Sequence, residues 1–179
     1  MDKIEYAIYF ATKAHEGQKK KSEDVAVIIH PFSVGMILKN FGCDDDVVIA
    51  GILHDTVEDT EVTYEKIEKE FGAYVSKLVK EASEDDKTLS WEDRKRHTIE
   101  FSKTISYEAK LIVAADKVNN LSWVLKDYFY IGDDVWKHTK SGKIKQKWYF
   151  ENLLKALREN ACNNKLFDRY EELNNNIFK

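Results

Sequence analysis

The chain has a single proline among its 179 residues, Pro31, and this scarcity restricts the folds open to it. Proline ends helices and marks turns, so its near absence permits long helices along almost the whole sequence. Apolar residues recur at spacings of three and four, and no stretch shows the alternation typical of a strand. We therefore expect an all-α bundle of roughly eight helices, forming a single domain over residues 1–179.

Polar residues mark where the expected helices begin. Thr63, Ser90 and Ser106 are each suited to cap a helix N-terminus. The apolar run 47–53 predicts a central, most buried helix, and residues 127–142 are expected to be looser. The helices are expected at about residues 6–14, 31–41, 44–59, 63–71, 73–82, 90–103, 107–126, 145–160 and 167–173.

Charge and hydropathy exclude several classes of protein. The 28 basic and 32 acidic residues leave a net charge of −4, which argues against a dedicated nucleic-acid binder. The longest apolar stretch, 47–53, is far shorter than the ~20 residues of a membrane span. The first residues lack a secretory pattern, and two distant cysteines do not indicate a disulfide framework. We expect a cytoplasmic protein without nucleic-acid or membrane partners.

Polar side chains follow the apolar run without a break: His54, Asp55, Glu58 and Asp59. On a continuous helix, residues three and four apart share a face, so one imidazole and three carboxylates would line one side. Carboxylates packed together repel one another and lose hydration, and a divalent cation would offset both effects. The alternative is an exposed acidic helix end, with His54 as a hydrogen-bonded core histidine.

Two further residues favour the metal interpretation. His30 stands directly before Pro31, which predicts extended geometry at a helix start. Asp116 interrupts an apolar helix face, where a lone acid would otherwise be interpreted as a buried hydrogen-bonding residue. Two imidazoles and two carboxylates from three helices form a ligand set suited to Mn²⁺, Fe²⁺ or Zn²⁺.

The same residues resemble the H…HD…D pattern of the HD-domain metal-dependent phosphohydrolases, and above all the hydrolase domain of the RelA/SpoT family. The block L-H-D-T-V-E-D-T at 53–60 is similar to the signature helix of that family. Further similar segments are A-H-E-G-Q at 14–18, I-I-H-P at 28–31, F-G at 71–72 and A-A-D-K-V-N-N-L at 114–121. D-K-T-L at 86–89 and R-K-R at 94–96 resemble the stand-alone small alarmone hydrolases related to the metazoan SpoT homologue.

The resemblance implies an HD-type domain with a core at about 6–125 and a helical C-terminal extension at about 143–176. It implies hydrolysis of the 3′-pyrophosphate of ppGpp or pppGpp, which releases pyrophosphate and GDP or GTP. One Mn²⁺ would be bound by four ligands: His30, His54, Asp55 and Asp116. Glu58 and Asp59 would position and activate the attacking water. The substrate would contact Lys20, Lys21, Asn120, Lys145 and Tyr149.

Departures from the family pattern leave alternatives open. Lys20 stands where an arginine usually stacks on the base, and an ammonium lacks that planar face. Residues 23–27 replace the usual Gly and Pro-Tyr before His30. An HD phosphohydrolase of another nucleotide, such as NADPH or a nucleoside phosphate, therefore stays open, as does a silent alarmone-binding module. The length leaves no room for a synthetase domain, and the sequence allows a homo-oligomer.

Overall fold

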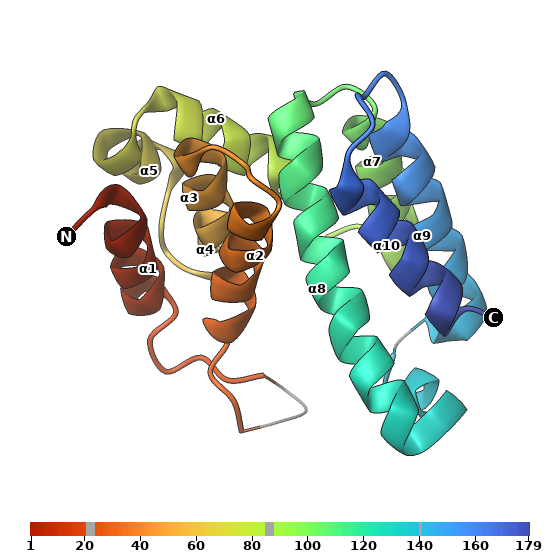
Figure 1. Ribbon diagram of the computed structural model, residues 1–179. Helices are drawn as coiled ribbons and strands as arrows, with labels where there is room; N and C mark the ends of the chain where they lie inside the picture. The colour runs from red at the N-terminus through yellow and green to blue at the C-terminus, as the bar shows by residue number, and fades with distance from the viewer. Residues whose placement is uncertain (21–23, 85–87, 140) are drawn as a thin grey trace.

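The structure is a computed structural model that describes residues 1–20, 24–84, 88–139 and 141–179. Within these ranges it consists of ten α-helices and one 3₁₀ helix, without a strand, so the all-α expectation is confirmed there (Figure 1). The helices are α1 (Lys3–Ala14), α2 (Ile29–Asn40), α3 (Asp45–Leu53), α4 (Thr56–Asp59), α5 (Tyr64–Phe71), α6 (Ala73–Ala82), α7 (Trp91–Ser102), α8 (Tyr107–Ile131), η1 (Gly132–His138), α9 (Gly142–Arg158) and α10 (Lys165–Ile177).

Helix α3 lies at the centre of the first six helices, as its apolar run predicts. Every residue from Val47 to Leu53 is buried, and α1, α2, α6 and α8 all pack against the helix. Asp45 and Asp46 occupy its first turn, where the helix macrodipole favours negative charge. The chain therefore leaves α3 deep inside the protein, where polar side chains need partners.

Helices α2 and α3 approach each other closely at two glycines. A Cβ atom on Gly51 would lie 2.3 Å from the Leu38 side chain, and one on Gly35 would lie 2.4 Å from that of Ile52. Without these side chains the two helix backbones can pack tightly. The ring centroids of His30 and His54 are consequently only 5.3 Å apart.

Two local expectations about these helices are wrong. Helix α2 begins at Ile29, so His30 is helical rather than extended, and Pro31 is the third residue of the helix. Proline is tolerated there because the first N–H groups of a helix have no intrahelical partner. The expected continuous helix 44–59 is also broken, because α3 ends at Leu53 and a turn at His54–Asp55 precedes α4.

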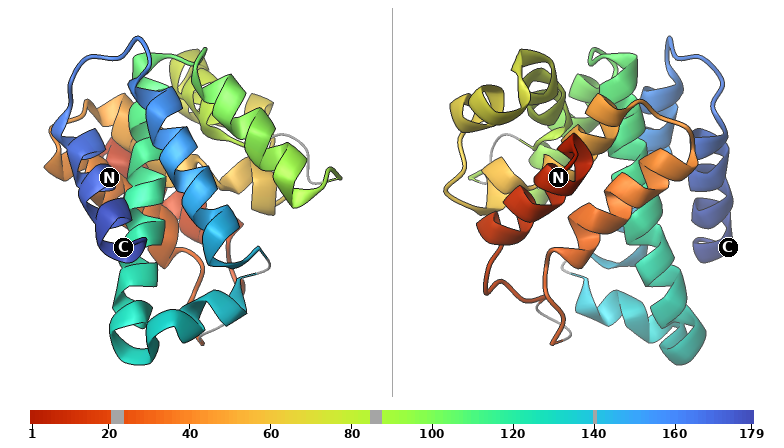
Figure 2. Two further views of the ribbon diagram at one scale, coloured as in Figure 1. Left: turned by 90° about the vertical axis from the view of Figure 1, so that its right-hand side faces the viewer. Right: turned by 60° about the vertical axis from the view of Figure 1, so that its left-hand side comes forward.

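The long helix α8 separates the α1–α6 group from α9 and α10 (Figures 1 and 2). It contacts α2, α3 and α6 on one side and packs extensively against α10 on the other. The expected loose stretch at 127–142 is wrong in its first part, since α8 continues to Ile131 and η1 follows. Val135 and Trp136 are buried, which holds η1 to the bundle. None of the described helices is long and apolar enough to cross a membrane.

Candidate active site

The turn after α3 presents two potential metal ligands at one point. The Nδ1 atom of His54 lies 2.8 Å from the Gly51 carbonyl oxygen, so Nδ1–H donates there and Nε2 is the ligand nitrogen. The Asp55 carboxylate oxygen lies 3.0 Å from that Nε2 atom. The backbone of both residues is close to helical, and the two side chains nevertheless meet at this point.

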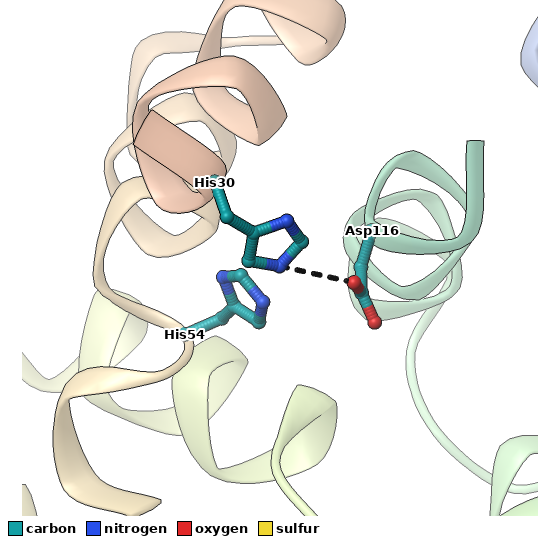
Figure 3. Close-up of side chains that lie close together, drawn as sticks. All are labelled: His30, His54 and Asp116. Atoms are coloured by element: carbon teal, nitrogen blue, oxygen red, sulfur yellow. Dashed lines mark ion pairs between the residues drawn. The ribbon is translucent and has the colours of Figure 1, made fainter. Parts of the chain in front are cut away.

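His30 and Asp116 reach the same point from α2 and α8. The His30 Nδ1–H group donates to the side-chain oxygen of Asn119, 2.7 Å away, which turns Nε2 toward the carboxylates. That Nε2 atom lies 3.2 Å from Asp116 and 3.4 Å from Asp55. Figure 3 shows both imidazoles pointing from one side toward Asp116 on the opposite helix.

These residues fit a divalent cation. One ligand atom from each of His30, His54 and Asp116 lies within 4.8 Å of the others. Ligand atoms that share a metal at bonds of ~2.0–2.2 Å are separated by about 2.8–3.6 Å, which spans the nitrogen–oxygen distances seen here. The buried Nε2 of His54 has an Asp55 oxygen 3.0 Å away but makes no well-aligned hydrogen bond among the described residues. A cation at this point would satisfy that nitrogen and neutralise the carboxylates.

The charges of the site shift its titration strongly. Burial disfavours a charged imidazole, but the carboxylates of Asp55 and Asp116 outweigh it and raise the pKa of His54 to about 9. Burial also opposes ionisation of Asp116, yet Lys117 and the two histidines hold the pKa of that carboxyl well below its usual range. Asp116 is therefore ionised and available as a ligand at neutral pH.

Three neighbouring residues on α8 orient the ligands. The sequence motifs did not identify them as positioning groups. Lys117 lies 2.5 Å from one oxygen of Asp116, and the Asn120 amide donates to the other at 2.7 Å. Asn119 fixes His30, as described above. Lys117, Asn119 and Asn120 all belong to the 114–121 motif, which was the available signal. Such outer contacts fix the orientation of metal ligands.

The ligands open onto a cavity of about 240 Å³, which is lined by residues of α2, α4, α6, α7, α8 and α9 and of the turn after α3. Glu58 lines it, and one of its oxygens accepts the main-chain N–H of Glu84 at 2.6 Å. Lys95 lines the other side, 3.1 Å from the Glu84 carboxylate. Burial and the nearby Lys117 lower the pKa of Lys95, although Glu84 opposes this effect. A polyanion entering the cavity would relieve the repulsion between the two lysines.

The structure separates the two acids expected to act as catalytic residues. Glu58 faces the cavity beside the ligands. Asp59 is exposed and lines a different hollow, near Gln18, between α1 and α4. Of these two acids, only Glu58 shares a cavity with the four proposed ligands His30, His54, Asp55 and Asp116.

The expected substrate contacts are also divided. Asn120 and Tyr149 line the cavity, and the buried Tyr149 hydroxyl has no hydrogen-bond partner within the described part of the chain. Lys20 lies with its amine 3.8 Å from the centre of the Trp123 ring on α8. Lys145 is not brought into the cavity; it pairs with Glu92 outside it. Lys21 lies outside the described residues, as do residues 86 and 87 of the D-K-T-L segment.

The fold and the ligand pattern define a class of protein. A family profile described as an HD domain matches residues 7–128, and the chain belongs to the HD-domain family. Among curated proteins it is similar to the guanosine-3′,5′-bis(diphosphate) 3′-pyrophosphohydrolase MESH1 of Danio rerio, 41% identical over 117 residues, and of Homo sapiens, 44% identical over 115. The matched segment spans 64% of the length of each of these relatives.

Two solved structures extend the match over more of the chain. The metazoan orthologue of SpoT that hydrolyses ppGpp is 30% identical, with a TM-score of 0.81, covering 98% of this chain and 96% of that one. Protein lmo0812 of Listeria monocytogenes EGD-e is 40% identical, with a TM-score of 0.77, covering 84% and 96% respectively. The family resemblance carried by the sequence motifs is confirmed.

Proposed function

We propose that this protein is a metal-dependent 3′-pyrophosphohydrolase of ppGpp and pppGpp. The observation that carries the proposal is the convergence of two imidazole nitrogens and two carboxylates beside a cavity that also holds Glu58 and two lysines. The relatives from Danio rerio and Homo sapiens bear the name of this activity. The expected metal is Mn²⁺, held by His30, His54, Asp55 and Asp116.

Each group in the cavity has a role in this reaction. A bound Mn²⁺ supplies a Lewis acid that polarises the phosphate and lowers the pKa of water. Glu58, fixed by the Glu84 N–H, accepts the proton of the attacking water. Lys95 neutralises phosphate charge. Burial raises the pKa of Tyr149 to about 12, so its hydroxyl stays protonated and donates to a phosphate oxygen.

The experiment that tests the proposal is a substrate panel of ppGpp, pppGpp and NADPH. The protein is first stripped with EDTA and then reloaded with Mn²⁺, Zn²⁺ or Mg²⁺. We expect turnover of both alarmones only after reloading, with release of pyrophosphate. Preferred turnover of NADPH would favour a phosphohydrolase of another nucleotide. Tight binding of ppGpp without turnover would favour a catalytically silent alarmone-binding module. Full activity in verified metal-free protein would refute the mechanism.

Metal binding is expected to depend on pH through His54. With a pKa of about 9, this imidazole is protonated in the metal-free protein at pH 7.5, and a cation at Nε2 must displace the proton. Mn²⁺ affinity should therefore rise about tenfold per pH unit between roughly pH 6.5 and 8, below that pKa. Calorimetric titration in buffers of different ionisation enthalpy should show about one proton released. Binding without proton release would contradict this protonation state.

The base of the nucleotide is expected to lie near Lys20 and Trp123. Trp123 is seven residues beyond Asp116 on α8, so it lies about 10 Å further along the helix, comparable with the length of a nucleoside. Stacking on an aromatic ring contributes about 1–3 kcal/mol, so Trp123→Leu should raise KM for ppGpp roughly tenfold with little change in kcat. Lys20→Ala should also raise KM for ppGpp.

The matched control is Lys126→Ala, because Lys126 also lies over the Trp123 ring, at 4.6 Å, but one turn further from the metal ligands. The Lys126→Ala substitution should raise KM less than Lys20→Ala does, since Lys126 lies further along α8 from the metal ligands. Equal KM values in all three variants would place the base elsewhere. Steady-state kinetics with ppGpp measures both parameters.

A further inference from the structure

The helix that carries Glu58 is too short to hold its own position. Helix α4 is a single turn of four residues, Thr56–Asp59. Isolated turns are unstable because nucleation costs more than one or two hydrogen bonds return. On the α6 side, the Ser83 hydroxyl donates to the His54 carbonyl at 3.2 Å, and the Glu84 N–H donates to Glu58. The other end of the turn needs its own support.

Gln18 supplies that support from the segment between α1 and α2. Its side-chain amide donates to the main-chain carbonyl of Asp59 at 2.7 Å, across 41 residues of sequence. The last carbonyls of a helix have no intrahelical partner, so this contact caps the C-terminal end of α4. Removing it would take away this side-chain donor from the Asp59 carbonyl.

His15 determines which way the Gln18 amide faces. It is 3% exposed, and its Nδ1 atom lies 2.9 Å from the Gln18 side-chain oxygen. The oxygen must accept there, so the NH₂ group faces Asp59. The His15 Nε2 atom is buried and has no partner among the residues described, which agrees with a tautomer that carries its proton on Nδ1.

The main chain of Gln18 ties the same contact to the rest of the site. Its N–H donates to the His15 carbonyl, and its carbonyl accepts the Val27 N–H, both at 3.0 Å. Gln18 therefore joins the start of the segment that carries Lys20 to Val27, three residues before His30. One side chain thus joins the segment leading to a metal ligand to the turn that bears Glu58.

We propose that Gln18, oriented by His15, is a positioning residue that fixes α4 and so aims the Glu58 carboxylate at the metal site. This inference rests on the proposed function for its kinetic consequence. Gln18 acts through the backbone of Asp59 and does not act on the substrate itself. The pair accounts for a buried histidine and a long-range contact that the metal ligands do not require.

The first test removes the donor while keeping the side-chain size. Gln18→Glu presents an oxygen to the Asp59 carbonyl and should lower kcat about 10–100-fold, the effect expected when a reacting group is misplaced. KM for ppGpp and the bound Mn²⁺ should stay within about twofold of their original values. Unchanged kcat would overturn the inference.

Two substitutions of His15 separate orientation from packing. Asn places an amide N–H where the ring has Nδ1, whereas Gln places it near Nε2. We expect His15→Asn to keep turnover close to the original and His15→Gln to lower it as Gln18→Glu does. A role in packing alone predicts the reverse order, because Gln is closer to histidine in volume.

A double-mutant cycle and hydrogen exchange complete the test. In a Glu58→Gln background, Gln18→Glu should have less than about twofold further effect on kcat, and an equal loss in both backgrounds would overturn the inference. Gln18→Glu should also speed amide exchange at 56–60 but not in α8. If the unchanged protein does not hydrolyse ppGpp, the proposed function fails, and this exchange result alone decides whether Gln18 positions α4.

Discussion

Replacing Glu58 by glutamine is expected to reduce kcat for ppGpp by ~10²–10⁴-fold, the range typical of a lost general base. The amide keeps the size of the side chain and still accepts the Glu84 N–H, so α4 should stay in place. Bound Mn²⁺ should remain near one per chain because the four proposed ligands are untouched. Metal analysis and steady-state kinetics on the same preparation measure both quantities.

Asp59→Asn is the matched control for this substitution. Its side chain is exposed in a separate hollow, so we expect a smaller loss, and the double variant should behave much like Glu58→Gln alone. Nucleotide affinity of Glu58→Gln should hold or tighten, because a negative charge facing a polyanion has been removed. Normal turnover by Glu58→Gln would show that another group accepts the proton.

The helices could be predicted from sequence where their ends depend on local chemistry. Thr63, Ser90 and Ser106 cap α5, α7 and α8 as expected, each side-chain oxygen accepting a main-chain N–H. The apolar run 47–53 likewise predicted the buried centre, since a helix that is apolar on all sides must be enclosed. These features depend on residues within one or two turns of each other.

The break after α3 could not be predicted in the same way. His54 and Asp55 have helical propensity comparable with that of many helix residues, and nothing local forbids a continuous helix there. Side-chain contacts to the main chain accompany the break. One is local, the Thr56 hydroxyl that donates to the Leu53 carbonyl, and one is distant, the Ser83 hydroxyl 29 residues away that donates to the His54 carbonyl. The sequence also grouped Glu58 with Asp59. In the folded chain they line different hollows, because adjacent residues on a helix point about 100° apart.

Contacts between residues far apart in the sequence were the other feature that could not be predicted. Lys95 reaches the cavity because α7 packs against α9, and Gln18 meets Asp59 only once α1 and α3 are assembled. Lys145 shows the reverse case. It lies one turn before Tyr149 on α9, but it pairs with Glu92 outside the cavity, so helical spacing alone did not indicate which residue faces the site.

Replacing Asp116 by alanine is expected to abolish metal binding and turnover together and also to weaken the fold. Asp116 is the proposed ligand from α8, and it is the ion-pair partner of Lys117; both side chains are about 15% exposed. Removing one partner of a buried pair costs ~3–5 kcal/mol, and the residual exposure places this pair at or below the lower end. Loss of activity alone would therefore not distinguish a missing ligand from unfolding.

A second substitution separates these causes. The double substitution Asp116→Ala with Lys117→Met removes the buried charge that the single substitution leaves unpaired. It should restore most of the stability of the metal-free protein, because a buried ion pair can often be replaced by apolar side chains at little cost. It should still bind no Mn²⁺. Lys117→Met alone keeps the carboxylate and should retain the metal. Thermal unfolding of metal-free samples and metal analysis after dialysis give the two readouts. Stoichiometric Mn²⁺ in either Asp116 variant would mean that α8 does not supply a ligand.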